Sequence, residues 1–203
     1  MMKGNRRKTE FSLKGKVVFF ATGNIHKFSE VCSILTGVDI AVGMLRVKDT
    51  EIQSYSLMQI AQASSIDAFK RCGLPIIVED AGLFIDALNG FPGPYAAYVY
   101  KTIGNKGLLK LMQKVKNRKA RFGSVIAYCN GSSSLPICFE GEAEGEITVN
   151  ERVGNGKSGF GFDPIFKPDG SSKTFAEMTL EEKNGFSHRA KAVHRFAEWY
   201  KKS

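Results

Sequence analysis

The sequence has no hydrophobic run long enough to cross a membrane and no recognisable secretion signal. No window approaches the roughly 18 or more consecutive apolar residues that a membrane-spanning helix requires, and the basic start at residues 1–8 is not followed by an apolar stretch. We therefore expect a cytoplasmic protein without a membrane segment. The 203 residues, of which 43% are hydrophobic, suffice for one globular unit with its own core.

Cysteine pairs are also missing. The four cysteines, Cys32, Cys72, Cys129 and Cys138, form no C-x-x-C motif. This absence argues against a zinc ribbon and against the disulfide framework of a small secreted protein. We interpret the four side chains as buried or inert thiols. The sequence also contains no internal repeat and no low-complexity segment.

Acidic residues are in the minority. The chain has 29 Lys and Arg against 20 Asp and Glu, a net charge of +9, which attracts polyanions from nucleotides to RNA and DNA without distinguishing among them. Part of this excess precedes the first apolar run. We expect residues 1–15 to be a basic N-terminal extension, either a solvated tail or an arm that touches RNA or a membrane. Residues 16–203 are expected to form a single domain.

Hydrophobic periodicity predicts the elements of the first half. An apolar run at residues 17–21, a Gly/Asn turn, and apolar residues at helical spacing from 28 to 35 predict a strand, a loop and a helix. Residues 40–47 predict a second strand and residues 57–71 a second helix. Residues 75–78 are typical of a buried strand.

The pattern changes in the second half. Helices are predicted near residues 95–103 and 106–115, followed by a long hairpin whose strands span 121–128 and 137–149 and whose Asn-Gly turn lies at residue 130. A last strand near 164–166 precedes a C-terminal helix at about 187–200. This order indicates an α/β fold with a mixed sheet in two lobes rather than a regular βαβ array.

Four short segments carry the chemistry, and the first is Thr22-Gly23-Asn24-Ile25-His26-Lys27 between a buried strand and a helix. Gly23 permits close backbone approach and Asn24 can cap the helix. The free N–H groups, together with Lys27, suit a phosphate. A purely structural turn explains the same residues.

The second segment is Glu79-Asp80, with Glu51 upstream and Asp86 downstream. The pair is predicted to emerge at the end of the buried strand that begins at residue 75. Carboxylates at that place suit Mg²⁺, which prefers oxygen ligands and bridges to substrate phosphates. The alternative is a solvated acidic turn.

The third segment, residues 158–164, alternates glycine with Phe160 and Phe162 ahead of Asp163. Aromatic rings flanked by glycine can admit a flat base between them, and such stacking is worth roughly 1–3 kcal/mol per base. A core edge strand with glycine bulges would have the same pattern.

The fourth segment combines residues 182–184 with Ser187, His188 and Arg189 at a predicted helix start. His and Arg are donors that match a purine offering the acceptors O6 and N7, whereas adenine offers an amino donor at position 6. Cations at a helix N-terminus oppose the helix dipole and favour an anionic partner. A solvated basic surface is the alternative.

Together these segments resemble the inosine triphosphate pyrophosphatase family, the non-canonical purine NTP pyrophosphatases. The match runs in order over nearly the whole chain: residues 20–27 (FATGNIHK), 78–83 (VEDAGL), 87–95 (ALNGFPGPY), 139–141 (FEG), 159–166 (GFGFDPIF), 174–178 (TFAEM), 182–184 (EKN) and 187–189 (SHR). The resemblance implies an elongated mixed β-sheet flanked by helices, with a nucleotide cleft between two lobes. It also implies a homodimer that hydrolyses ITP, dITP or XTP to the monophosphate and pyrophosphate, with no membrane or nucleic-acid partner.

The resemblance assigns roles position by position. Glu51 and Asp80 would bind Mg²⁺, and Asp80 would also accept the proton from the attacking water. The other residues would contact the substrate: phosphates at Thr22, Gly23, Asn24, Ile25, His26, Lys27 and Lys183, the faces of the base at Phe160, Gly161 and Phe162, and its edge at Asp163, Ser187, His188 and Arg189.

The chain departs from the family pattern at three positions. Relatives often carry basic residues near Ser64 and at Ala97, and a serine where this chain has Ala81, also a candidate substrate contact. Lys70, Lys101 or a dimer mate are candidate replacements for the missing cations. The departures and the net charge keep a second hypothesis open, a nucleotide- or RNA-binding module on the same fold. A pyrophosphatase with another main substrate, such as dUTP, is a third.

Overall fold

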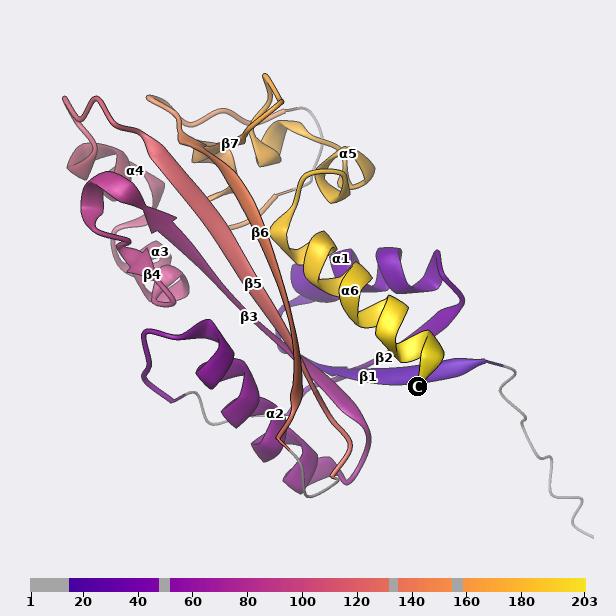
Figure 1. Ribbon diagram of the computed structural model, residues 1–203. Helices are drawn as coiled ribbons and strands as arrows, with labels where there is room; N and C mark the ends of the chain where they lie inside the picture. Colours follow the sequence, from indigo (N-terminus) through magenta and orange to yellow (C-terminus); the bar gives the residue numbers. More distant parts are fainter. Residues whose placement is uncertain (1–14, 48–51, 132–134, 155–158) are drawn as a thin grey trace, which may run out of the picture.

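The computed structural model describes residues 15–47, 52–131, 135–154 and 159–203, which form a seven-stranded mixed sheet flanked by helices (Figure 1). The strands lie in the order β2-β1-β3-β5-β6-β7, and a short β4 pairs with β3. Their bounds are β1 Lys16–Ala21, β2 Ile40–Leu45, β3 Ile76–Ile85, β4 Pro92–Gly93, β5 Lys119–Cys129, β6 Ile137–Ile147 and β7 Phe166–Pro168. The predicted mixed α/β fold is confirmed, and the sheet is open.

The parallel and antiparallel parts of the sheet meet at β3. β1 pairs in parallel with β2 and β3, whereas β3, β5, β6 and β7 pair antiparallel. The hairpin of β5 and β6 is the one that the Asn-Gly signal predicts. β5 is buried along nearly its whole length because α2 covers one side of the long strands and α6 covers the other (Figure 1).

Capping residues mark the ends of several helices. Asn24, Ser56 and Ser187 cap α1, α2 and α6 with their side-chain oxygens, and Gly73 ends α2 at a φ of 67°. None of the helices built by the described residues has the length and apolarity to span a membrane. Their bounds are α1 Ile25–Thr36, α2 Leu57–Cys72, α3 Ala96–Thr102, α4 Gly104–Leu111, α5 Leu180–Asn184 and α6 His188–Lys202, with short 3-10 turns η1 Asp86–Leu88, η2 Asp163–Ile165 and η3 Phe175–Glu177.

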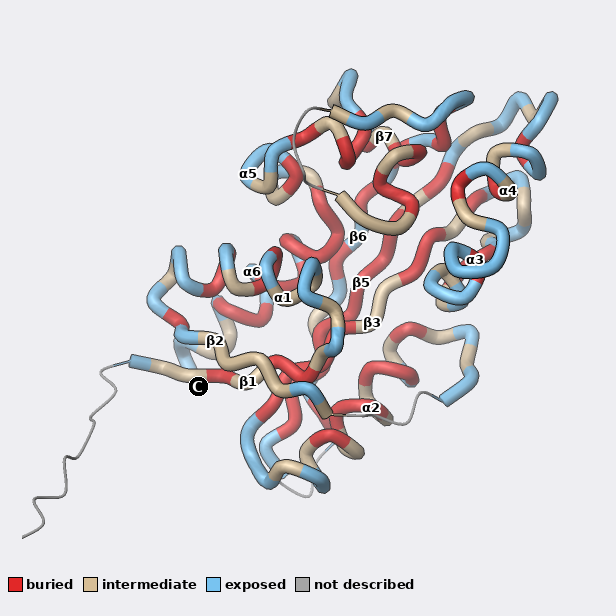
Figure 2. The backbone as a smooth tube through the Cα atoms, turned by 180° about the vertical axis from the view of Figure 1, so that it is seen from behind, coloured by how far each residue is buried: buried red, intermediate tan, exposed pale blue. Residues whose placement is uncertain are grey.

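Two hydrophobic clusters give the molecule two lobes. In one, α1 and α6 pack on β1 and on the first half of β3, around Phe20, Leu35 and Phe196. In the other, α4, β7 and η3 pack on the second half of β3 and the first half of β5, around Leu83 and Phe166. Figure 2 shows the buried stretches following the strands through both lobes. The long strands therefore connect the two cores, and the predicted two-lobe arrangement is confirmed.

The structure corrects two predicted strand ends. Glu79 and Asp80 do not follow a strand but lie inside β3, which continues to Ile85 because β5 pairs with it residue by residue. β1 pairs with β3 only at Ile76 and Ile77, and β4 only at Leu83 and Phe84, so the acidic pair lies between them on that edge. The strand predicted near 164–166 is also displaced: residues 163–165 form η2, with Pro164 in its first turn, and β7 starts at Phe166.

Candidate functional site

A cavity of about 630 Å³ lies where the β1–α1 loop, β3, α3, the segment before η2 and the start of α6 converge. Most of the predicted site residues meet there although they lie far apart in the sequence. The lining includes Asn24, His26, Lys27, Asp80, Ala81, Phe160, Gly161, Phe162, Asp163, His188 and Arg189.

The other predicted residues that the structure describes do not line this cavity. Lys183 is buried beneath Phe160 and lines a smaller cavity of about 220 Å³. The side chains of Thr22 and Ser187 bind backbone groups. The Thr22 hydroxyl accepts a hydrogen bond from the Asn24 N–H, and the Ser187 hydroxyl accepts one from the Ala190 N–H. Gly23 and Ile25 are exposed, and Glu51 lies outside the described residues.

The β1–α1 loop is built differently from the expected phosphate loop. The Asn24 side chain accepts hydrogen bonds from the backbone N–H groups of His26 and Lys27, at 2.9 and 3.2 Å. These two groups are therefore engaged by the helix cap, and the expectation that they are free for a phosphate is wrong in this conformation. Lys27 is the cation of this segment that lines the cavity, and in this structure it pairs with Glu79.

Behind the cavity lies a buried network of charges centred on Glu79. Its carboxylate forms ion pairs with Lys27 at 2.8 Å and with the Nε of Arg189 at 3.0 Å, and it accepts a hydrogen bond from Ser124 at 2.7 Å. Burial alone would raise the pKa of Glu79, but the charges of Arg189 and Lys27 outweigh it and hold the pKa well below its usual range. Glu79 therefore stays ionised.

The network extends through Glu30 of α1, which the sequence analysis missed. Glu30 pairs with the guanidinium of Arg189 and, at 2.7 Å, with the ammonium of Lys183, which also contacts Asp163 at 2.6 Å. The sequence held a signal for it, because Glu30 precedes the apolar Val31 and Ile34 on the buried side of α1. A charge at such a position requires a partner.

Phe160 covers the cationic part of the network. Its ring stacks on His26 with 5.3 Å between centroids, and Lys183 and Arg189 lie 5.1 and 5.4 Å from its centre. Gly159 and Gly161 have φ angles of +119° and +64°, which favour glycine. Asp163 accepts a hydrogen bond from the Phe160 N–H at 2.8 Å, so the ring is held at the cavity. The alternating Phe-Gly pattern therefore builds a turn, not an edge strand.

Phe162 and His188 occupy the deeper wall. Phe162 is buried and meets Tyr100 edge to face at 5.5 Å. The His188 ring stacks on Phe122, with 4.7 Å between centroids and 10° between planes. Its buried Nδ1 has no hydrogen-bond partner within the part of the chain that the structure describes. Burial lowers the pKa of His188 well below 6.5, and the charge of Arg189 lowers it further, so the imidazole is neutral.

We expect the protein to lose stability in two steps as the pH falls. The unfolded His188 takes up a proton below about pH 6.5 while the folded residue does not, so the free energy of unfolding falls from that pH by up to about 1.4 kcal/mol per pH unit. A second loss follows below about pH 4.5, because Glu30 and Glu79 have lowered pKa values when folded.

Urea unfolding from pH 7.5 to 4 measures this dependence. His188→Gln should flatten the curve between pH 6.5 and 5, whereas His194→Gln, the same change at an exposed position of α6, should leave its slope as in the wild type. An unchanged slope in His188→Gln would contradict the buried neutral imidazole.

The comparisons with known proteins agree with this geometry. A model described as the Ham1 family matches residues 18–199. The chain belongs to the Ham1 family. It is 52% identical over 184 residues to a protein named dITP/XTP pyrophosphatase from Methanopyrus kandleri, which covers 91% of this chain and 96% of that one. A protein of the same name from Hyperthermus butylicus is 46% identical over 187 residues, with coverage of 92% and 96%. The resemblance found in the motifs is thereby confirmed.

Solved Ham1 structures share the fold. A HAM1 protein from Coxiella burnetii has a TM-score of 0.80 at 28% identity, covering 93% of this chain and 100% of that chain. The Ham1 protein of Staphylococcus aureus has a TM-score of 0.77 at 29% identity, with coverage of 92% and 98%. The open sheet with its flanking helices is therefore the Ham1 architecture.

Asp80 and Glu79 have different surroundings in this Ham1 chain although they are neighbours. Successive residues of a strand face opposite sides of the sheet: Glu79 turns toward α1 and α6, whereas Asp80 lines both the large cavity and an adjoining one of about 500 Å³ that also contacts Gln53 and Tyr95. Glu79 is occupied by Lys27 and Arg189. Of these two neighbours, Asp80 is the one that lines the cavities.

A divalent cation fits this arrangement only with ligands from elsewhere. The described residues contain no group of three or more His, Cys, Asp and Glu side chains able to hold a metal by themselves. Mg²⁺ commonly uses one or two carboxylates and completes its shell with water and substrate phosphates. Asp80, beside a cavity large enough for a nucleotide, suits that mode of binding.

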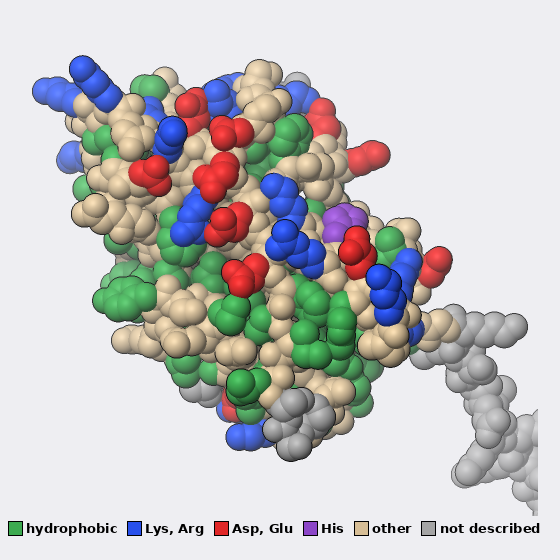
Figure 3. Space-filling model, in the orientation of Figure 1, with side chains coloured by type: hydrophobic (Ala, Val, Ile, Leu, Met, Phe, Trp, Pro, Cys, Tyr) green, Lys and Arg blue, Asp and Glu red, His purple; other side chains and the backbone are tan. Residues whose placement is uncertain are grey.

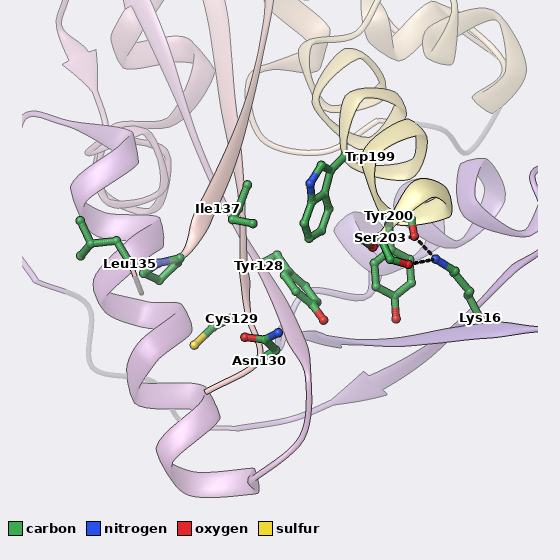
Figure 4. A pocket seen from close by; sticks show the side chains of 10 residues that line it. Lys16, Tyr128, Cys129, Asn130, Leu135, Ile137, Trp199, Tyr200 and Ser203 are labelled. Atoms are coloured by element: carbon green, nitrogen blue, oxygen red, sulfur yellow. Dashed lines mark hydrogen bonds between the residues drawn. The ribbon is translucent and has the colours of Figure 1, made fainter. Parts of the chain in front are cut away.

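Another cavity, of about 390 Å³, lies at the turn of the β5–β6 hairpin and the end of α6 (Figure 4). Tyr128, Trp199 and Tyr200 line it, and Lys16 closes one side by donating to the backbone carbonyls of Tyr200 and Ser203. None of the predicted site residues belongs to it. We assign it no role in the Ham1 site.

The four cysteines form no disulfide. Their thiols are free, and Cys129 is buried in β5.

The positions that depart from the family pattern lie in different surroundings. Ser64 is buried in α2 and does not line the large cavity, whereas Ala81 and Ala97 do. Lys70 is exposed near the end of α2, away from the lining. Lys101, in contrast, lines the cavity.

Proposed function

We propose that this protein hydrolyses non-canonical purine nucleoside triphosphates, such as dITP, ITP and XTP, to the monophosphate and pyrophosphate. The observation that carries the proposal is that one cavity joins the His188, Arg189 and Phe160 cluster to Asp80. Such a cavity suits a purine at one end and a phosphate chain at the other. The relatives named dITP/XTP pyrophosphatase support it.

Base recognition rests on donors that are already in place. Arg189 is held by Glu30 and Glu79, and His188 is a neutral imidazole whose Nδ1 has no partner among the described residues. An imidazole proton on Nδ1 would donate to the O6 acceptor of hypoxanthine or xanthine, whereas adenine would place an amino donor there. Phe160 and Phe162 contact the base faces, with Gly161, Asp163 and Ser187 shaping its surroundings.

The reaction takes place at the other end. Asp80 accepts the proton of a water whose oxygen attacks the α-phosphorus, and the bond from that phosphorus to the bridging oxygen breaks to release pyrophosphate. Asp80 and Glu51 would hold Mg²⁺ together with substrate oxygens, and the ion would neutralise charge on the phosphates. Lys27 and the β1–α1 loop bind the phosphate chain. Lys183 is assigned to the same task, although it contacts Glu30 and Asp163 in this structure. We further propose that the enzyme is a cytoplasmic homodimer.

A binding module without turnover is the second candidate, motivated by the net charge of +9. On the face seen in Figure 3, however, Lys and Arg side chains are interspersed with Asp and Glu. The described residues of that face therefore offer a nucleic-acid backbone no patch of a single sign. An RNA binder would lose affinity steeply with increasing salt concentration.

A panel of nucleoside triphosphates tests the function. With Mg²⁺ present, dITP, ITP and XTP should yield monophosphate and pyrophosphate much faster than ATP, because a buried donor facing an amino donor costs roughly 1–3 kcal/mol, or about 5- to 150-fold in specificity. Nucleoside diphosphate and free phosphate as first products would contradict the assigned bond. No release from any substrate, together with salt-sensitive RNA binding, would favour the binding module.

A further inference from the structure

Lys101 is a cation of the cavity wall that the assigned site does not use. It lies in α3, is exposed, and lines the same cavity as Lys27, Asp80 and Arg189. Its ammonium forms no hydrogen bond or ion pair with any residue that the structure describes. It is therefore available to a ligand.

The other cations around the cavity are already neutralised. Lys27 pairs with Glu79, Lys183 with Glu30 and Asp163, and Arg189 with Glu30 and Glu79. These three cations and three carboxylates sum to a formal charge of zero. A polyanionic phosphate chain entering the cavity thus needs positive charge that the buried network does not supply.

We propose that Lys101 binds the polyphosphate chain of the nucleotide. The inference rests on the proposed function and adds to it a positioning residue from α3, opposite the β1–α1 loop. Ala97 lies one helical turn before Lys101 and lines the same cavity. Both positions therefore project to the side of α3 that faces the substrate.

The structural alternative is that Lys101 only stabilises α3. A lysine in the last turn of a helix interacts favourably with the helix dipole. That role predicts a small change in melting temperature on substitution and no change in substrate binding. The two roles are therefore separable by experiment.

Steady-state kinetics with dITP test the proposal. Lys101→Ala should raise KM by about fivefold, which is the upper range for an ion pair at a partly exposed site, with kcat within about twofold of the wild type. The double variant Ala97→Lys/Lys101→Ala should bring KM most of the way back to the wild-type value, because it returns a positive charge to the same wall of the cavity. At about 1 M salt, where screening reaches a few Å, the wild type and Lys101→Ala should converge.

Lys110→Ala is the matched control, since it removes the same charge from the exposed side of neighbouring α4. It should leave KM unchanged. Calorimetric binding of inorganic tripolyphosphate, without metal, gives a readout independent of turnover: Lys101→Ala should bind about fivefold more weakly than Lys110→Ala.

The outcomes separate the inference from the function on which it rests. An active wild type with equal KM and equal tripolyphosphate affinity in both variants overturns the role of Lys101 and leaves the proposed function standing. A wild type without turnover overturns the proposed function, while weaker tripolyphosphate binding in Lys101→Ala alone still supports Lys101 as the anion contact. A shift of melting temperature alone assigns Lys101 to helix stability.

Discussion

Asp80→Asn is expected to lower kcat for dITP by at least ~10²-fold, the low end of what a positioned acid or base usually contributes. The substitution keeps the shape of the side chain but removes the negative charge that faces both cavities. On the proposed function it removes the proton acceptor and a metal ligand together, while the base contacts remain. Nucleotide binding should be partly retained, which separates a lost chemical step from a lost site.

Asp86→Asn provides the control, because it makes the same chemical change on the same segment at an exposed residue of η1. This variant should keep kcat within about twofold of the wild-type value, because a substitution at an exposed position has little effect on a distant chemical step. Near-normal turnover in Asp80→Asn would move the proton acceptor elsewhere. Glu79 is adjacent in sequence, but Lys27 and Arg189 already hold its charge.

Arg189→Ala should destabilise the fold by about 3–5 kcal/mol, because it leaves Glu30 and Glu79 buried with one cation fewer. For a chain of this size, that loss corresponds to a fall in melting temperature of roughly 6–20 °C. Arg195→Ala on the same helix is the control. Its guanidinium is exposed and donates to the carbonyl of Glu140, so its loss should cost less than about 1 kcal/mol.

Arg189→Lys separates base recognition from stability. It keeps the charge but loses the planar fork that reaches both carboxylates and faces the cavity. We expect a folded variant in which kcat/KM falls more for dITP than for dATP, narrowing the ratio between them. An unchanged ratio in the folded variant would assign Arg189 to the charge network alone and leave base reading to His188.

Local sequence signals predicted the elements well where they depend on nearby residues. The helices α1, α2 and α6 begin next to the capping residues Asn24, Ser56 and Ser187, and the β5–β6 hairpin turns near its Asn-Gly signal. Strand ends were less predictable. The buried strand was predicted to end at residue 78, yet β3 continues to Ile85 because pairing with β5, about forty residues later, decides its length.

The candidate site likewise has features that the sequence predicts and features that only the fold reveals. Motif order alone indicated the inosine triphosphate pyrophosphatase family and brought out Asp80, Phe160, His188 and Arg189, because residue type and spacing are properties of the chain. Which groups become partners is decided by the fold. That Glu30 and Glu79 hold Arg189 and that Lys101 faces the cavity both depend on distances between segments. The sequence by itself determined which chemical groups are present and near which elements. Only the tertiary structure decided which charges are neutralised and which remain for a substrate, since electrostatic interactions act through space over a few Å and not along the chain.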